Sequence, residues 1–312
     1  MSRALRTHAA IAALLLAPVL AWAQAGDEHA GHAHGEMAAP EAPAAAAVAP
    51  VHDPKLPAGE AGAKAVLETS PRHGEFVDIA VPGRAAPLRA WVVYPERRDK
   101  APVVVVIHEI FGLSDWIRGV TDQLAKEGFL AVAPDLLSGL GPNGGGTESL
   151  ACRDDAVKLV RTLKSDSVQA CLAATRAWAT AQPSASGRCG AVGFCWGGST
   201  SFQFAIAQPS LDGAVVYYGA SPDSAALQRL AAPVLGLYGE DDARVVATVE
   251  PAKRVLAARK AAFETHLYPG AGHGFLRQQD QREGANLAAS RQAWERTIAF
   301  LREKTQAKAR RY

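Results

Sequence analysis

The sequence predicts an α/β fold with a mostly parallel central sheet that is flanked by helices on both faces. Short runs of β-branched and aromatic residues alternate with longer stretches of helical spacing, from Phe76 almost to the end of the 312-residue chain. Such alternation is typical of parallel sheets whose crossovers are helices. Residues 103–107 are an uninterrupted apolar run, as expected of a central strand that is covered on both faces. The pattern shows no internal repeat and no second core, so we predict one folded domain over residues 64–312.

Each expected element follows from a local pattern. Residues 76–81 and 88–94 alternate in polarity on either side of the Pro82-Gly83 turn, which predicts an antiparallel strand pair. After the central strand, Ser114 is a suitable N-cap and Gly128 a suitable stop for a helix. The remaining alternation predicts strands at 129–133, 190–194, 213–218, 234–238 and 266–268, and helices at 154–163, 168–181, directly after 195, and at 285–304. In such sheets, ligand sites lie beyond the carboxyl ends of the strands.

Residues 1–23 have the features of a secretory signal peptide. Arg3 and Arg6 make a basic start, a short apolar core follows, and Ala21-Trp22-Ala23 is a cleavage pattern. The apolar run is too short to span a bilayer comfortably. We therefore expect a periplasmic or secreted protein that is free of the membrane once the signal is cleaved, in an oxidising compartment.

Residues 24–63 are rich in alanine, proline, glycine and histidine and contain almost no large apolar residue. Such a segment cannot bury enough surface to offset its ordering entropy, which predicts a disordered leader. Short histidine-rich tracts can bind transition metals, although we favour a solvated linker with incidental histidines. The residues in question are His29, His32, His34, Met37 and His52.

The overall composition narrows the class of partner. Hydrophobic residues make up 48% and charged residues 21% of the chain, which is ordinary for a globular protein. The formal net charge of +2 falls to zero once Arg3 and Arg6 are removed. This balance indicates neither a nucleic acid nor an anionic membrane as the main partner.

A cysteine lies at the centre of the most informative motif, Gly193-Phe194-Cys195-Trp196-Gly197, which links an apolar run to a helical stretch. The pattern is typical of a nucleophile elbow in which cysteine takes the place of serine. Side chains at positions 193 and 197 would clash with the neighbouring strand and helix. A free cysteine in such a turn can also be a small buried hydrophobic residue. A thiol redox role is disfavoured because the chain has no Cys-x-x-Cys motif.

A cysteine nucleophile needs a base and an orienting acid, in the chain order nucleophile, acid, histidine. His266 lies inside an expected strand, where a structural role is the better interpretation. His273 lies in a glycine-flanked loop directly after that strand. The loop after the preceding strand offers Glu240, Asp241 and Asp242, and periodicity does not distinguish among them.

An oxyanion needs two backbone N–H donors, one directly after the nucleophile and one from the loop after an early strand. Trp196 supplies the first. The motif His108-Glu109-Ile110-Phe111-Gly112 directly follows the central strand, and we expect Ile110 to supply the second.

The motifs together resemble the dienelactone hydrolase family, whose members have the α/β-hydrolase fold. The resemblance runs from Phe76 to Leu301, and the family's Gly-x-x-Asp-x-x-Val pattern points to Asp242. It therefore implies a triad of Cys195, Asp242 and His273. The four motifs are 108–112, 193–198, 239–245 (Gly-Glu-Asp-Asp-Ala-Arg-Val) and 270–275 (Gly-Ala-Gly-His-Gly-Phe).

The resemblance also implies roles for residues around the triad. Glu109 matches a family glutamate that contacts the nucleophile thiol and can take its proton when substrate binds. Arg277 matches an arginine that binds a substrate carboxylate, for which the bidentate guanidinium is well suited. Arg153 is the nearest candidate for a second such arginine, and Phe111 is an expected substrate contact.

The implied activity is hydrolysis of lactones or esters that carry a carboxylate, as by a carboxymethylenebutenolidase. The reaction would proceed through a thioester acyl-enzyme, without a cofactor or a metal, in a monomer. One alternative is a general short-chain carboxylesterase on the same scaffold. Another is a non-catalytic periplasmic protein that binds metal through the histidine-rich leader.

Three cysteines remain besides Cys195. In an oxidising compartment this is an odd number of thiols, so they cannot all pair within the chain. Cys152 and Cys171 lie near the ends of two expected helices and could form a disulfide. Cys189, at the start of a strand, would then be a buried free thiol.

Overall fold

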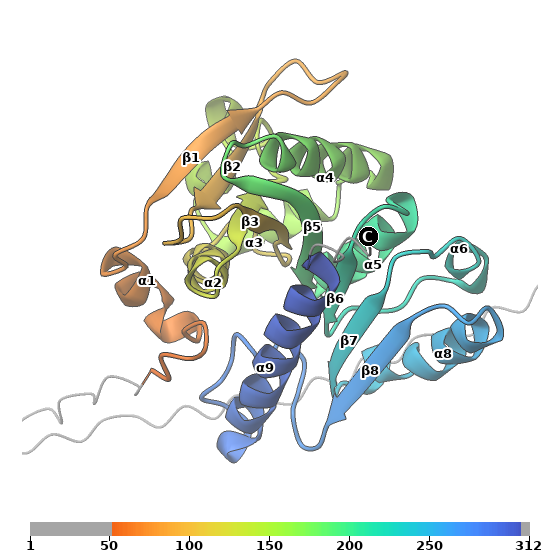
Figure 1. Cartoon of the computed structure of the whole chain (residues 1–312). Helices are drawn as coiled ribbons and strands as arrows, with labels where there is room; N and C mark the ends of the chain where they lie inside the picture. Colours follow the sequence, from red (N-terminus) through yellow and green to blue (C-terminus); the bar gives the residue numbers. More distant parts are fainter. Residues whose placement is uncertain (1–51, 307–312) are drawn as a thin grey trace, which may run out of the picture. The chain divides into compact units, whose positions relative to one another are not determined.

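Eight strands form one sheet in the computed structural model of the chain, which describes residues 52–306. Their order across the sheet is β1-β2-β4-β3-β5-β6-β7-β8 (Figure 1). The pairs β1–β2 and β2–β4 are antiparallel, and all the other neighbours are parallel. The strands are β1 Gly74–Ile79, β2 Leu88–Val93, β3 Ala101–Ile107, β4 Leu130–Pro134, β5 Ala185–Phe194, β6 Gly213–Tyr217, β7 Val234–Gly239 and β8 Phe263–Tyr268.

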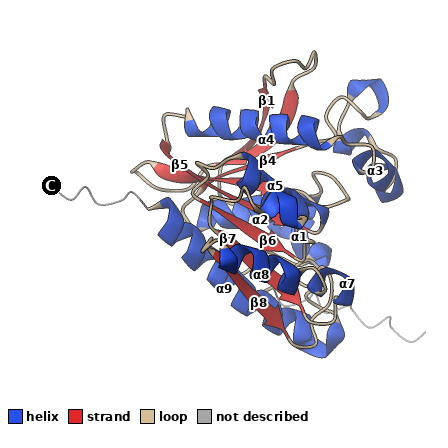
Figure 2. Ribbon diagram, turned by 90° about the vertical axis from the view of Figure 1, so that its right-hand side faces the viewer, coloured by secondary structure: helices blue, strands red, loops and turns tan. Residues whose placement is uncertain are grey.

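Helices cover both faces of this sheet, as Figure 2 shows, so the predicted fold class is confirmed. Every strand and helix expected from the sequence is present, with bounds that differ by a few residues. In the described part of the chain the helices are α1 Glu60–Glu68, α2 Asp115–Lys126, α3 Arg153–Val160, α4 Ser165–Thr180, α5 Trp196–Ala207, α6 Ser224–Leu227, α7 Ala243–Val246, α8 Val249–Ala258 and α9 Ala285–Thr305, with short 3-10 turns at Pro142–Gly144, Thr147–Ser149 and Arg282–Gly284.

Helix α2 begins and ends where its sequence predicts. The hydroxyl of Ser114 accepts a hydrogen bond from the amide of Ile117, which satisfies one of the unpaired N–H groups of the first turn. Gly128 follows the last turn with a φ of +94°, a left-handed conformation that favours glycine. These two local signals fix the helix that packs beside the central strand.

The core lies on both sides of the sheet. In β3, Val103, Val105 and Ile107 pack into one apolar cluster with side chains of α4, α5 and α8. Val104 and Val106 pack into the opposite cluster with side chains of α2 and α9. All five side chains are fully buried, which is why this strand has no polar face in the sequence.

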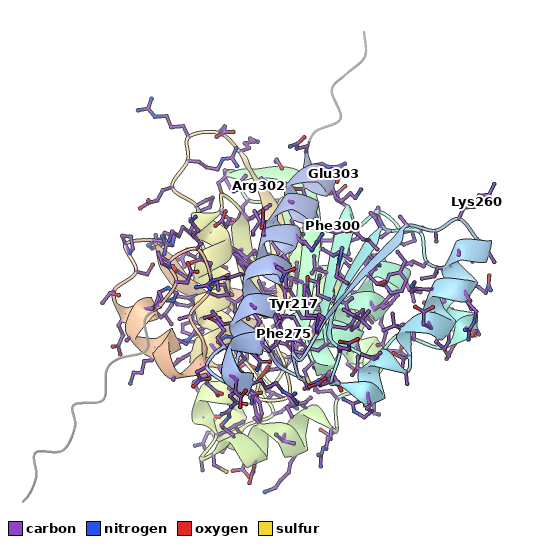
Figure 3. The ribbon with its side chains drawn as sticks, turned by 90° about the horizontal axis from the view of Figure 1, so that it is seen from below. Tyr217, Lys260, Phe275, Phe300, Arg302 and Glu303 are labelled. Carbon is purple, nitrogen blue, oxygen red and sulfur yellow. The ribbon has the colours of Figure 1, made fainter. Side chains whose placement is uncertain are left out.

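The last helix, α9, is fastened to the middle of the sheet. Figure 3 shows it lying across the strands, with Tyr217 and Phe275 beside it. The buried hydroxyl of Tyr217 on β6 is 2.7 Å from the hydroxyl of Thr297 on α9, and the rings of Tyr217 and Phe275 are 5.8 Å apart. This packing holds the loop that contains Phe275 against the sheet.

The predicted boundary of the leader at residue 63 is wrong. Leu56 and Ala63 are only 2% exposed and pack with Trp116 of α2 in the main core. Helix α1 begins at Glu60, within the predicted leader. Its alanine, lysine, leucine and glutamate residues favour a helix, and small apolar side chains suffice to dock it on α2. The signal peptide and residues 24–51, with four of the five leader residues that we singled out, lie outside the described residues.

All four cysteines are free thiols in the structure. Cys152 is exposed and Cys171 is buried in α4, so the suggested disulfide between them is wrong. Cys189 is fully buried, as predicted for a free thiol. Within residues 52–306, no helix is both long and apolar enough to cross a membrane.

Candidate active site

A strained turn between β5 and α5 presents Cys195. Its φ of 55° and ψ of −116° are rare for a residue with a side chain. A Cβ on Gly193 would lie 2.0 Å from the carbonyl oxygen of Gly197, and a Cβ on Gly197 would lie 2.3 Å from the carbonyl oxygen of His108. Both glycines are therefore required by close backbone contacts, which is the physical basis of the motif.

Three side chains from distant parts of the chain meet at this turn. Nε2 of His273 is 3.0 Å from Sγ of Cys195, and Nδ1 of His273 is 2.5 Å from Oδ2 of Asp242. Asp242 follows β7 and His273 follows β8, so all three lie at carboxyl ends of parallel strands. Asp241 instead pairs with Arg282 near the surface.

The surroundings of His273 favour its protonated form. Burial lowers the pKa of the imidazole, but hydrogen bonds to Asp242 and to Cys195 outweigh it and raise the pKa to about 9. An imidazole with this pKa can hold the proton of the thiol at neutral pH. The arrangement can therefore generate a thiolate beside an imidazolium.

Two backbone amides beside the elbow have no protein acceptor within residues 52–306. Trp196 is the first residue of α5, where a helical N–H lacks an intrahelical partner. Ile110 lies in the loop after β3, and β3 is hydrogen-bonded to β5. These are the two donors expected from the sequence, and both remain available to an oxygen of a substrate.

Glu109 contacts an arginine rather than the thiol. Glu109 is 2% exposed, and its Oε1 lies 2.8 Å from Nε of Arg277. No hydrogen bond joins Glu109 to Cys195 among the described residues, and the thiol is paired with His273. Burial raises the pKa of Glu109 to about 7, while the charge of Arg277 acts in the opposite direction.

We expect replacement of Glu109 by glutamine to remove part of the pH dependence of stability. Between its ordinary pKa of 4.5 and the folded value of about 7, this group binds more protons in the folded state than in the unfolded state. It therefore makes the free energy of unfolding fall as the pH rises through that window. Urea unfolding should show that, from about pH 5 to about pH 8, the free energy of unfolding falls by roughly 1–3 kcal/mol more for wild type than for the variant. If the free energy of unfolding changed equally in the two proteins, the raised pKa of Glu109 would be contradicted.

The structure also brings together the three expected substrate-binding residues. The guanidinium carbon of Arg153 is 3.8 Å, and that of Arg277 is 5.1 Å, from the centre of the Phe111 ring. Both arginines pair with the carboxylate of Glu60 at the start of α1. His266, in contrast, pairs with Glu264 on its own strand and is not part of this group.

Two residues of the site were not found from the sequence. Tyr218 follows β6 with a φ of 39°, and its ring lies edge-on to His273 with centres 5.2 Å apart. Its hydroxyl is buried without a partner in the described part of the chain. Glu60 lies in the segment that composition assigned to the leader. The run of helix-favouring residues after Gly59 was the one signal for it.

Comparisons with known proteins agree with the fold. The sequence profile of the "Dienelactone hydrolase family" matches residues 88–305. A "Putative carboxymethylenebutenolidase" of Salmonella typhimurium is 32% identical over 234 residues, covering 71% of this chain and 85% of the relative. A protein of the same name from Saccharolobus solfataricus is 31% identical, covering 70% and 94%. The crystal structure titled "Putative Dienelactone Hydrolase" from Klebsiella pneumoniae superimposes with a TM-score of 0.64 at 31% identity, covering 74% of this chain and 98% of that one.

Proposed function

The chain belongs to the dienelactone hydrolase family and is a hydrolase that acts on esters, and from this premise we propose that Cys195, His273 and Asp242 carry the reaction through a thioester. The observation that carries the proposal is the position of His273, whose two ring nitrogens lie 3.0 Å from the thiol and 2.5 Å from the carboxylate. A nucleophile paired with a base, which is itself paired with an acid, is the arrangement that acyl transfer requires.

The proposed first half-reaction forms the acyl-enzyme. The thiol proton passes to Nε2 of His273, and the thiolate attacks the carbonyl carbon of the ester or lactone. The amides of Ile110 and Trp196 stabilise the oxygen that becomes negative. As the C–O bond breaks, the imidazolium returns the proton to the leaving oxygen, and the acyl group remains on Cys195 as a thioester.

The second half-reaction hydrolyses the thioester. His273 takes a proton from a water molecule, the resulting hydroxide adds to the thioester carbonyl, and the same two amides stabilise the new oxyanion. The C–S bond breaks, the acid is released, and the thiol is restored. A thiolate attacks activated esters and lactones well, because they have good leaving groups, so these are the proposed substrates.

Two classes of substrate fit this chemistry. Arg153, Arg277 and Phe111 support a lactone or ester that carries a carboxylate, as the family resemblance implies. One observation favours the second candidate, a general short-chain carboxylesterase: both guanidiniums are already paired with Glu60. The proposed chemistry at Cys195 is the same for both.

The covalent step can be tested directly. We expect the protein to hydrolyse p-nitrophenyl butyrate, and an acid-quenched sample to carry one butyryl group on the peptide that contains Cys195. Pretreatment with iodoacetamide should abolish both the turnover and the acyl adduct. Turnover that proceeds without any acyl adduct, and that survives alkylation of Cys195, would contradict the proposed mechanism.

A further inference from the structure

The carboxylate of Glu60 lies between the two arginines of the site. Oε1 of Glu60 is 2.5 Å from Nη1 of Arg153, and Oε2 accepts a hydrogen bond from Nη1 of Arg277. The ring of Phe111 packs under both guanidiniums, and Arg277 also contacts Glu109. Two guanidiniums that converge above an aromatic ring make a binding site for a carboxylate. In this chain, that site is filled by the protein's own side chain.

Glu60 is held in this position by its backbone as well as by its charge. The amide of Glu60 donates a hydrogen bond of 2.9 Å to the carbonyl oxygen of Arg277. Glu60 is the first residue of α1, where the helix dipole stabilises a carboxylate. A Cβ on Gly59 would lie 3.3 Å from the same carbonyl oxygen of Arg277, so the chain approaches the active-site loop closely at this point.

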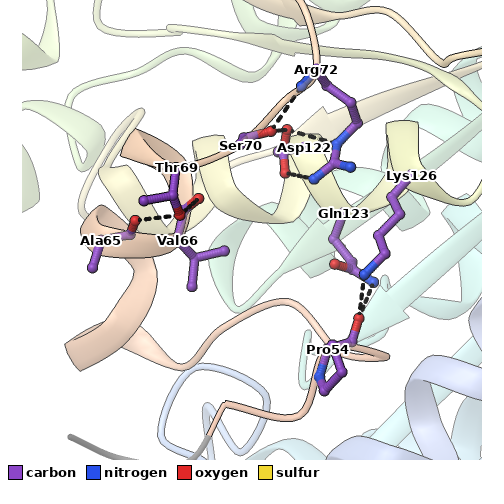
Figure 4. Close-up of polar contacts among 9 residues, drawn as sticks. All are labelled: Pro54, Ala65, Val66, Thr69, Ser70, Arg72, Asp122, Gln123 and Lys126. Carbon is purple, nitrogen blue, oxygen red and sulfur yellow. Dashed lines mark hydrogen bonds and ion pairs between the residues drawn. The ribbon is translucent and has the colours of Figure 1, made fainter.

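The segment that carries Glu60 is also fastened to α2 at both of its ends (Figure 4). Before α1, the carbonyl oxygen of Pro54 accepts a hydrogen bond of 2.6 Å from Nζ of Lys126. After α1, Asp122 accepts hydrogen bonds from Ser70 and Arg72, at 2.5 and 2.9 Å. The Arg72 and Asp122 side chains are only 12% and 5% exposed. The start of α1 is therefore a fixed part of the site.

We propose that Glu60 is a specificity-determining residue that makes the site favour uncharged esters and lactones over those that carry a free carboxylate. The proposal rests on the function proposed above. A substrate carboxylate must displace Glu60 from both arginines, and a side chain tethered at the site competes at a high effective concentration. The displaced carboxylate would also remain close to the incoming negative charge. An uncharged substrate leaves both ion pairs intact.

The test compares two substrates of similar length, p-nitrophenyl hydrogen glutarate, which has a free carboxylate, and p-nitrophenyl pentanoate, which has none. Glu60→Gln keeps the size of the side chain and removes its charge. We expect it to raise kcat/KM for the glutarate ester by about 10- to 100-fold, mainly through a lower KM. For the pentanoate ester, kcat/KM should change by less than about threefold.

Three further variants separate this role from a structural one. Glu60→Asp keeps the charge and should keep the wild-type preference. Glu68→Gln removes an exposed charge from the other end of α1, where Glu68 pairs with Lys64. It should leave kcat/KM unchanged for both substrates. Adding Arg153→Gln to Glu60→Gln should remove most of the gain in kcat/KM for the glutarate ester. If Glu60→Gln changed kcat/KM for the two substrates by the same factor, the proposal would be overturned, because a structural defect acts on both reactions.

Failure of the proposed function is distinguishable from failure of this inference. If wild type and Glu60→Gln hydrolyse neither ester, then the function fails while the carboxylate site can still be measured by calorimetry with glutarate. We expect the Kd of glutarate to be at least about tenfold lower for Glu60→Gln than for wild type. Equal affinities would overturn the inference whatever the outcome of the ester assays.

Discussion

Cys195→Ala is expected to reduce kcat/KM for p-nitrophenyl butyrate by about 10⁴-fold or more, a loss of the size seen when a nucleophile is removed from a triad. In the proposed mechanism the sulfur of Cys195 bonds to the acyl group, and alanine leaves no thiol for His273 to deprotonate. Cys195→Ser should retain a small residual activity. A hydroxyl has a far higher pKa than a thiol, so an imidazole tuned to pair with a thiolate is a poor base for it.

The fold should survive this substitution. Alanine keeps the Cβ that the strained conformation at φ 55° already accommodates, so the circular dichroism spectrum and the thermal midpoint should change little. Cys152→Ala provides the matched control, because Cys152 is an exposed thiol outside the site, and it should leave turnover unchanged. Wild-type turnover in Cys195→Ala would refute the central assignment.

Asp242→Asn should give the second-largest effect, a loss of about 10²- to 10⁴-fold in kcat. Its carboxylate orients Nδ1 of His273 at 2.5 Å and is one of the two hydrogen-bond partners that raise the pKa of the imidazole. An amide preserves the shape and removes the charge. The pKa of His273 should therefore fall, so that the imidazolium loses its proton at a lower pH than in wild type.

The adjacent carboxylate supplies the control. Asp241 pairs with Arg282 and is about half exposed, so Asp241→Asn should retain nearly full activity. The pKa of His273 can be followed by NMR titration of its ring protons in both variants. An Asp242→Asn variant with wild-type kcat, or a loss of activity that is the same for both aspartates, would exclude Asp242 as the orienting acid.

The nucleophile elbow and the succession of strands and helices along the chain could be predicted from the sequence because they depend on neighbouring residues. The alternation of apolar runs with helical stretches is set by side-chain direction within each element. The glycine at 193 is dictated by a close contact with the backbone of Gly197 in the same turn. The cap at Ser114 and the stop at Gly128 are likewise local. Such signals need no knowledge of which elements pack together.

The partners of the charged residues could not be predicted in this way. Periodicity left Glu240, Asp241 and Asp242 equivalent. The family pattern pointed to Asp242, and the packing of the β7 and β8 loops brings that carboxylate to His273. Glu109 was expected at the thiol, yet it lies against Arg277. In each case the choice depends on distances between loops that are separated in sequence.

The sequence by itself determined the fold class, the elbow with Cys195 and the loop with His273. The tertiary structure alone decided that residues 52–63 belong to the domain and that Glu60 pairs with Arg277, a residue 217 positions away. The physical reason is that small apolar side chains and a single carboxylate give no periodic pattern of their own. Their positions are fixed by the surfaces of α2 and of the active-site loops, which exist only once the chain has folded.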